Sequence, residues 1–256
     1  MSDTALEAAL RRDRRVVATG LAVIAALAWG YTVLLAARMP TDMSAMAMPE
    51  RAGWDAVEFL VVFVMWAVMM TAMMVQSVAP LVLLYAAVQR RRGAASSYLA
   101  VTVFCGGYLA IWTGFGLAST LAQGSVHAAA LAADDMGPVI RPLGAAILLV
   151  AGAYQFTPLK RVCLAHCRSP LAFITVYWRD GLRGAFTMGL RHGAYCLGCC
   201  WPLMLLLFVV GVMNLLWIAA LAVLVLIEKV LPGGEWVARL GGIVFLAWGV
   251  WLLLTG

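Results

Sequence analysis

Charged residues are scarce in this sequence, and the scarcity excludes a soluble globular domain. Only 12% of the 256 residues are Asp, Glu, Lys or Arg, and 64% are hydrophobic, whereas soluble domains carry about 25% charged residues. Segments that strictly alternate polar and apolar residues are missing too. The apolar residues form continuous runs of roughly 20 residues, the length of a transmembrane helix. Because continuous runs favour helices over a membrane β-barrel, the sequence predicts an all-α, polytopic transmembrane helical bundle.

The residue sets that carry common enzyme chemistry are also missing. The sequence has no paired carboxylates at membrane depth, no Ser/His/Asp set and no phosphate loop, and a haem held by His166 and His192 is disfavoured. We therefore predict that the chain is not an enzyme, with thiol redox activity as the only enzymatic alternative. The net charge of +6 does not indicate a nucleic-acid partner. The basic residues flank the apolar runs, where they set the orientation of a membrane protein.

The apolar runs and the basic residues between them predict the topology. We expect about seven membrane helices, with a short helix at the cytoplasmic face between the fourth and the fifth. Fifteen of the 18 lysines and arginines then lie on one side, and three (Arg38, Arg51 and Arg141) lie on the other. This asymmetry predicts an inner (plasma) membrane protein with a cytoplasmic segment 1–15, a single transmembrane domain 16–256 and an outer carboxyl end. The expected helices are 16–37, 56–89, 97–121, 139–156, one that ends near 210, 215–230 and 237–254.

Two short segments concentrate metal-ligating side chains within residues 157–200, which we place at the cytoplasmic face. Five of the six cysteines and two of the three histidines lie between Cys163 and Cys200. In R-H-G-A-Y-C-L-G-C-C-W-P-L-M, which ends at Met204, helical spacing puts one ligand on each turn of a single face. The upstream segment begins with the expected N-cap Thr157 and repeats the pattern at i, i+3 and i+4. Thiolate and imidazole bind Cu(I), zinc and similar metals. The predicted ligands are Cys163, His166, Cys167, His192, Cys196, Cys199 and Cys200.

Methionines form two further groups. One group (Met39, Met43, Met46 and Met48) falls in a predicted outer loop, 38–55, and the other falls in the second helix. A Met stripe can fill an irregular core, because the side chain is unbranched and adaptable. Thioethers also bind Cu(I) while competing poorly for zinc, so both interpretations stay open. The candidate metal path through the membrane comprises Met65, Met69, Met70, Met73, Met74 and Met204.

Several motifs together resemble a known family. They are Y-Q-F-T-P-L-K-R-V-C-L-A-H-C-R-S-P, G-L-R-H-G-A-Y-C-L-G-C-C-W-P-L-M, G-V-M-N-L-x-W followed by E-K, and M-W-x-x-M-M-x-A-M-M at Met65–Met74. The chain is similar, over roughly residues 55–255, to a bacterial domain-of-unknown-function family of predicted metal-binding integral membrane proteins. The resemblance implies an inner-membrane location and a metal site. One departure is that the family's proline soon after A-M-M occurs here only at Pro80.

These patterns favour a membrane protein that binds a soft or borderline metal ion. Copper as Cu(I) is favoured and zinc is next, with metal transport or handling as the role. Besides the lipid bilayer and the ion, the expected partner is a metallochaperone or an accessory membrane subunit. One alternative is a membrane thiol–disulfide protein that uses the C-x-x-C of Cys196 and Cys199. Another is an accessory subunit in which the cysteines hold a structural zinc.

Overall fold

The computed structural model describes residues 3–38, 54–92, 97–131 and 137–255, and every regular element within these ranges is an α-helix. The fold class is therefore the predicted all-α bundle. The predicted outer loop with Met39, Met43, Met46 and Met48 lies outside the described residues. The helices are α1 (Asp3–Arg38), α2 (Ala56–Arg91), α3 (Ser97–Leu131), α4 (Gly137–Tyr154), α5 (Pro158–Arg168), α6 (Pro170–Tyr177), α7 (Gly181–Leu205), α8 (Leu207–Val210), α9 (Leu215–Val230) and α10 (Gly234–Leu254).

Five of the described helices (α1, α2, α3, α7 and α10) are long and apolar enough to cross a membrane. Helices α4 and α5 together would add a sixth span, bent by 65° between them. The seven predicted membrane helices correspond to these six plus α9, with α4 in place of the bent pair. At 16 residues, α9 is shorter than the roughly 20 residues that usually cross a bilayer.

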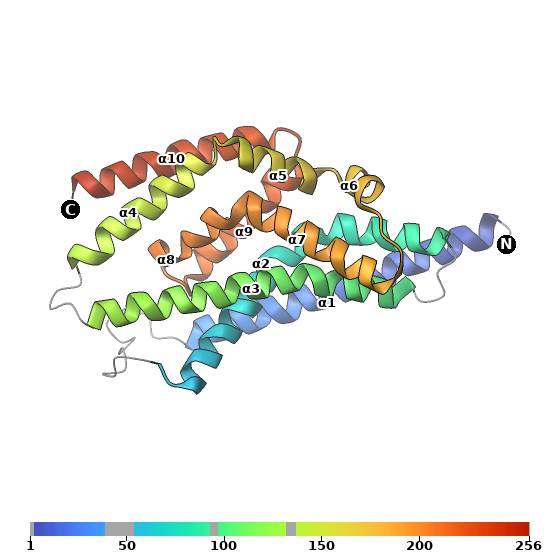
Figure 1. The fold of residues 1–256 in the computed structure, drawn as a ribbon, viewed down its shortest axis with the longest axis horizontal. Helices are drawn as coiled ribbons and strands as arrows, with labels where there is room; N and C mark the ends of the chain where they lie inside the picture. The colour runs from blue at the N-terminus through green and yellow to red at the C-terminus, as the bar shows by residue number, and fades with distance from the viewer. Residues whose placement is uncertain (1–2, 39–53, 93–96, 132–136, 256) are drawn as a thin grey trace.

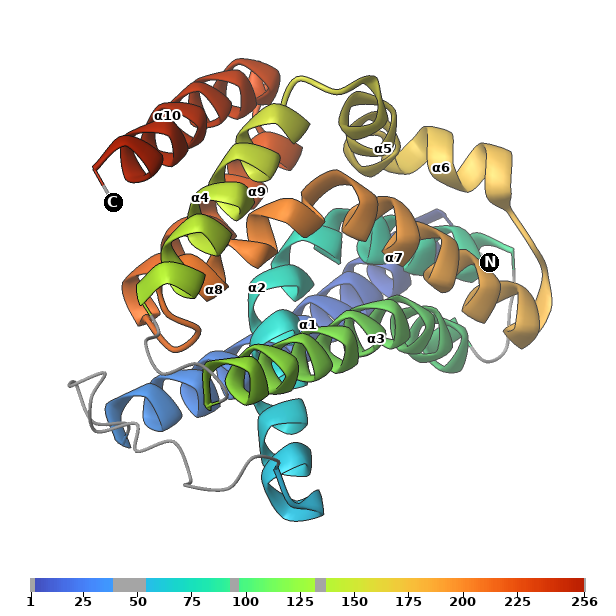
Figure 2. The ribbon, with the colours of Figure 1, turned by 60° about the vertical axis from the view of Figure 1, so that its left-hand side comes forward.

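The helices form two sets (Figures 1 and 2). Helices α1, α2, α3 and α7 run side by side, with α7 packed against α3 and α2 packed between α1 and α3. Helix α4 pairs with α10 on the other side of the bundle, and α9 contacts both α10 and α2. The short helices α5 and α6 connect α4 to the start of α7, and α5 packs against α7. This last contact creates the candidate site.

Local sequence explains where the helices next to the site begin. The hydroxyl of Thr157 accepts a hydrogen bond from the backbone of Lys160, and Pro158 supplies the first residue of α5, as predicted. At the start of α2, the carboxylate of Asp55 accepts hydrogen bonds from the backbone N–H groups of Val57 and Glu58, both at 2.8 Å. The Glu58 carboxylate in turn accepts a hydrogen bond from the backbone N–H of Asp55. This capping box fixes the start of the methionine-rich helix.

Small residues let α3 and α7 come into backbone contact. A Cβ added at Gly189 would lie 2.0 Å from the Phe104 carbonyl oxygen, and one added at Gly107 would lie 2.3 Å from that of Phe186. Gly107 of α3 is therefore in close contact with the backbone of α7. Gly106, in contrast, has no atom within 4 Å of such a Cβ. The α3–α7 contact holds α7 in position along its length.

Two predicted features of the fold were wrong. The predicted outer loop 122–137 is largely helical, because α3 continues to Leu131 rather than ending near Leu121. The segment L-A-Q-G-S-V-H-A-A-A-L carries four alanines and two leucines, which have high helix propensity. The second error concerns Lys160, which the sequence places at the membrane surface with the rest of segment 157–200. In the structure it is buried, with only 1% of its surface exposed. A buried Glu228 compensates its charge, as described below.

Candidate metal centre

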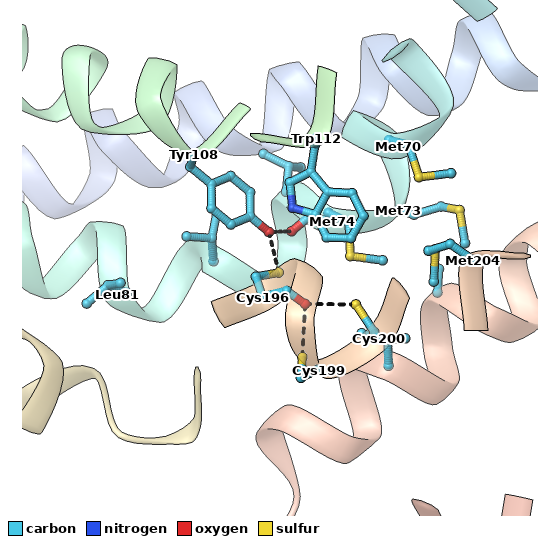
Figure 3. Close-up of a cluster of buried hydrophobic side chains, with 14 of the residues drawn as sticks. Met70, Met73, Met74, Leu81, Tyr108, Trp112, Cys196, Cys199, Cys200 and Met204 are labelled. Carbon is cyan, nitrogen blue, oxygen red and sulfur yellow. Dashed lines mark hydrogen bonds between the residues drawn. The ribbon is translucent and has the colours of Figure 1, made fainter. Parts of the chain in front are cut away.

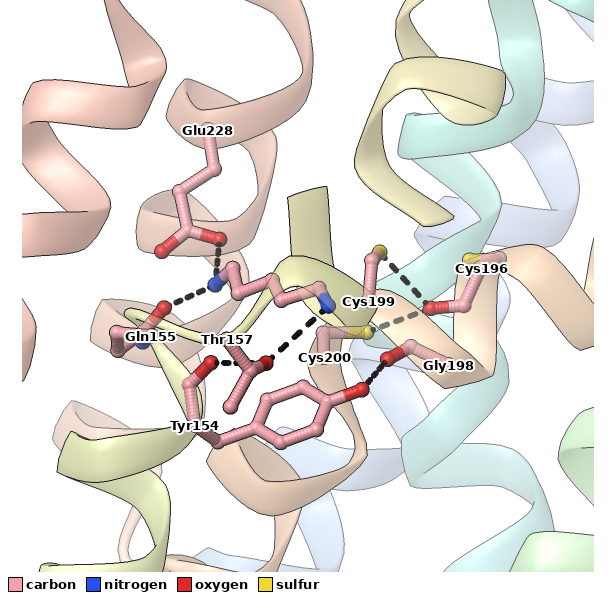
Figure 4. Close-up of polar contacts among 9 residues, drawn as sticks. Tyr154, Gln155, Thr157, Cys196, Gly198, Cys199, Cys200 and Glu228 are labelled. Carbon is pink, nitrogen blue, oxygen red and sulfur yellow. Dashed lines mark hydrogen bonds and ion pairs between the residues drawn. The ribbon is translucent and has the colours of Figure 1, made fainter. Parts of the chain in front are cut away.

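One face of α7 carries the residues that the four-residue spacing predicts. His192, Cys196 and Met204 are all buried, with 3%, 1% and 0% of their surface exposed, and Cys200 is equally enclosed. Figure 3 shows the sulfur atoms of Cys196, Cys199 and Cys200 within a single turn of this helix. Pro202 removes the hydrogen bond that the Gly198 carbonyl would otherwise accept. That carbonyl accepts from the Tyr154 hydroxyl of α4 instead, next to the cysteines (Figure 4).

Helix α5 brings a further thiol to this turn. Cys167 packs against the core that holds the cysteines of α7, and its side chain interacts with those of Cys196 and Cys199, which in turn interact with Cys200. We call these four residues the thiol cluster. All four are free thiols. Cys167 and Cys196 are 29 positions apart in the sequence, and the two segments that carry them therefore meet in the core of the bundle.

The thiols also contact groups other than sulfur. The thiols of Cys199 and Cys200 each donate a hydrogen bond to the Cys196 carbonyl oxygen, at 3.0 Å (Figures 3 and 4). The Cys196 sulfur lies 3.0 Å from the Tyr108 hydroxyl of α3. Tyr108 donates in turn to the carbonyl oxygen of Met74 on α2, at 3.1 Å. Helices α2, α3, α5 and α7 are thus joined at the thiol cluster.

Cys163 and the two histidines lie beside the thiol cluster rather than in it. The Cys163 sulfur packs against Gly198, where an added Cβ would come within 2.8 Å of it. His192 stacks near Tyr108 with ring centroids 6.0 Å apart, and its Nδ1 has no hydrogen-bond partner among the described residues.

His166 faces a different group of side chains. Its ring stacks on Tyr195 at 4.1 Å, and its Nδ1 lies 2.8 Å from the Val162 carbonyl oxygen. The Tyr177 hydroxyl lies 3.0 Å from that of Tyr195 and 3.4 Å from Nε2 of His166. The hydrogen bond with Tyr195 raises the pKa of Tyr177. The predicted ligand His166 is thus engaged by aromatic residues.

The methionines of the predicted path line the same buried region. Met65, Met69, Met70, Met73 and Met74 of α2 are each at most 5% exposed, and Met204 of α7 is fully enclosed. They belong to one core cluster with the cysteines. In Figure 3, Met70, Met73 and Met74 from α2 and Met204 from α7 point into the space between these helices, on the side where Cys196 and Cys200 lie.

Lys229 is a neighbour of the thiol cluster that the sequence did not predict. From the sequence, the adjacent opposite charges of Glu228 and Lys229 indicate a pairing with each other or with Arg239. The structure shows a different arrangement, in which the Lys229 amine lies 2.9 Å from the Cys196 sulfur and 3.2 Å from the Ser77 hydroxyl oxygen. The only sequence signal was an adjacent pair of opposite charges at the end of an apolar helix.

Glu228 is paired with a different lysine. Its carboxylate accepts from the Lys160 amine at 2.7 Å, and Gln155 accepts from the same amine (Figure 4). Both charged side chains are almost fully buried. This ion pair joins the end of α9 to the start of α5 and so fixes α5 against α7. It explains why Lys160 lies in the core and not at the surface.

No group of three or more His, Cys, Asp or Glu side chains within the described ranges is arranged to hold a metal ion. The thiols are close together but are turned toward the hydrogen bonds described above. The donors gathered here are thiols and thioethers, a set suited to Cu(I) rather than to Mg²⁺ or Ca²⁺.

The fold and the site together define a helical bundle with membrane-spanning character and a sulfur-rich core. The family whose model matches residues 63–252 is PpoB2, described as a copper chaperone. The match covers most of the chain, which therefore belongs to this family. It includes the methionine-rich part of α2 and all the cysteines, and it leaves out residues 1–62, which include α1. No curated protein and no solved structure matches the chain.

Proposed function

We propose that this protein binds Cu(I) at the thiol cluster and passes it on, as a membrane-embedded copper-handling protein. The observation that carries the proposal is the convergence of Cys167, from α5, with three cysteines of α7 in a buried region lined by methionine. Soft thiolates and thioethers select Cu(I) over harder ions. The family's description points in the same direction.

The arrangement supports a site made of sulfur alone. Cys200 and Met204 lie one turn apart on the same face of α7, and Met74 lies across from them on α2 (Figure 3). Each thiol can turn about its Cα–Cβ bond from its present hydrogen bond toward an ion. A mixed thiolate–thioether set needs fewer cysteines than a four-coordinate zinc site.

The methionines of α2 supply weaker sites for movement along the bundle. Met65, Met69 and Met73 recur every four residues, so their side chains follow one stripe of the helix. A path for an ion requires sites that bind and also release, and neutral thioethers meet that need better than thiolates do. We place this path in the inner membrane with the amino end inside, on the basis of the lysine and arginine distribution.

The test is Cu(I) binding by the purified full-length protein in detergent. Copper is titrated under reducing, oxygen-free conditions against a chromogenic Cu(I) chelator, and zinc is titrated in parallel. We expect stoichiometric copper binding by the unchanged protein. A variant with Cys196→Ser, Cys199→Ser and Cys200→Ser should lose it.

The matched control is Cys105→Ser. Cys105 is a cysteine of α3 outside the thiol cluster, so this change should leave copper binding unchanged. Equal copper binding by the triple variant and the unchanged protein would place the site elsewhere. Zinc bound in preference to copper would favour the structural-zinc alternative, in which chelator should also lower the melting temperature.

A further inference from the structure

Within the described ranges, Lys229 forms no ion pair with a carboxylate, and the nearby carboxylate of Glu228 is paired with Lys160. The Lys229 side chain is buried, and the ion pairs of the described residues join Arg90 to Asp13, Arg92 to Asp180 and Lys160 to Glu228. The Lys229 amine instead contacts the Cys196 sulfur and the Ser77 hydroxyl. A buried charge is costly unless it is paired. The thiol cluster is therefore the group that can supply the matching negative charge.

A positive charge beside a cation site is unfavourable unless the charges of the ligands and the ion are matched to it. In the mixed thiolate–thioether site proposed above, with Cys196 and Cys200 as the two ionised ligands, the thiolates contribute two negative charges and the ammonium contributes one positive charge. A monovalent ion brings the total to zero, with the thiol protons released to solvent. A divalent ion on the same ligands leaves a net charge of +1 in the core. In a medium of low dielectric constant, such an imbalance strongly disfavours binding.

We propose that Lys229 makes the thiol cluster selective for monovalent over divalent soft cations, by contributing one fixed positive charge at the Cys196 sulfur. This inference rests on the proposed function, because it concerns the same site. Lys229 touches no ion in this account. It acts through Cys196, whose sulfur it contacts, and it is a specificity-determining residue rather than a ligand.

The probes are two soft ions that differ in charge and share a filled d shell. Ag(I) and Cd(II) are isoelectronic, both bind thiolates, and neither undergoes redox chemistry under these conditions. The affinity of the full-length protein in detergent is measured for each ion, by competition with a chelator of known affinity. The quantity of interest is the ratio of the two affinities, because a general loss of packing would lower both together.

The primary variant is Lys229→Gln, which keeps a hydrogen-bonding group next to Ser77 and removes the charge. We expect the Ag(I)-to-Cd(II) affinity ratio to fall by about tenfold or more relative to the unchanged protein. Lys229→Arg is the matched control, since it keeps the charge and should keep the ratio within about threefold. If Lys229→Gln does not fold, Ser77→Asp replaces it, because a carboxylate there would cancel the charge with Lys229 in place. The same fall is then expected.

A ratio that is the same in the charge-neutral variant and in the unchanged protein would overturn the inference. So would an equal fall in Lys229→Arg, because the effect would then follow shape and not charge. Failure of the proposed function has a different signature. The unchanged protein would then bind neither Cu(I) nor Ag(I), or it would bind them as well after Cys196, Cys199 and Cys200 are replaced.

Discussion

Lys160 and Lys229 both lie in the core of the bundle, with 1% and 6% of their surface exposed, but their surroundings differ. Lys160 has a carboxylate partner, Glu228, at 2.7 Å and a further acceptor in Gln155. Among the residues that the structure describes, Lys229 contacts a thiol and a hydroxyl and forms no ion pair with a carboxylate. The first lysine belongs to a neutral pair that joins helices. The second leaves a positive charge for the thiol cluster to balance.

The comparison separates two uses of the same side chain. A buried ion pair between fixed charges holds elements together, and removing either partner leaves an isolated charge. A lysine against thiols instead couples its charge to whatever the sulfur atoms bind. The two lysines should therefore respond differently to substitution. Changes at the Lys160 pair should lower stability, whereas changes at Lys229 should alter metal binding more than stability.

The largest effect on stability is expected from Glu228→Gln. This change leaves the Lys160 charge buried without a counter-ion and should lower the free energy of unfolding by about 3–5 kcal/mol. The measurement is thermal or denaturant unfolding in detergent. The double variant Lys160→Met with Glu228→Leu removes both charges and should recover most of the loss. A double variant as unstable as the single one would show that the charge imbalance is not the cause.

A smaller loss of stability is expected from Lys229→Met. The change removes hydrogen bonds to Cys196 and Ser77 and should lower the free energy of unfolding by about 1.5–3 kcal/mol. Copper affinity should change more in this variant than in the folded fraction of Glu228→Gln, where copper binding is affected only through the position of α5. The comparison between the two lysines would be wrong if the two variants exchanged these phenotypes.

Gly198→Ala tests the contact between α5 and α7. Its Cβ would lie 2.8 Å from the Cys163 sulfur, so the Cys163 side chain must rotate or α5 must shift. We expect a loss of about 1–2 kcal/mol and weaker copper binding, because Cys167 moves with α5. Gly106→Ala is the matched control. A Cβ added at Gly106 has no atom of another segment within 4 Å, so this change should be neutral or stabilise the helix by up to about 1 kcal/mol. Equal effects of the two changes would mean that α5 is not held closely against α7.

The smallest effect is expected from Tyr108→Phe. This change removes the hydroxyl that lies next to the Cys196 sulfur and donates to the Met74 carbonyl, and it leaves the ring in place. We expect a stability loss of about 0.5–1.5 kcal/mol. Copper affinity should fall by less than in the Lys229 variant, since no charge is lost. A larger fall than that would assign the principal role at Cys196 to Tyr108.

The composition and the local motifs predicted most of the fold. Long apolar runs predicted the helical bundle, and Thr157 with Pro158 predicted the start of α5. Four-residue spacing predicted that His192, Cys196, Cys200 and Met204 share a buried face of α7. These features depend on local periodicity and capping, which neighbouring residues determine.

The parts that depended on contacts between distant segments could not be read from the sequence. Nothing local to Lys160 or Glu228 shows that they meet across 68 residues, or that Lys229 approaches Cys196. The histidines illustrate the same limit. His166 has ligand spacing with Cys163 and Cys167, yet its ring stacks on Tyr195, which comes from α7. Helical spacing indicates a face, but the neighbouring helices decide what that face meets.

The most direct test of a sulfur site for Cu(I) is X-ray absorption at the copper edge on the copper-loaded full-length protein. We predict a first shell of sulfur only in the unchanged protein, with loss of that shell when Cys196 and Cys200 are both changed to serine. A first shell containing nitrogen or oxygen ligands, or a sulfur shell that persists in the double variant, would contradict the assignment of copper to the thiol cluster.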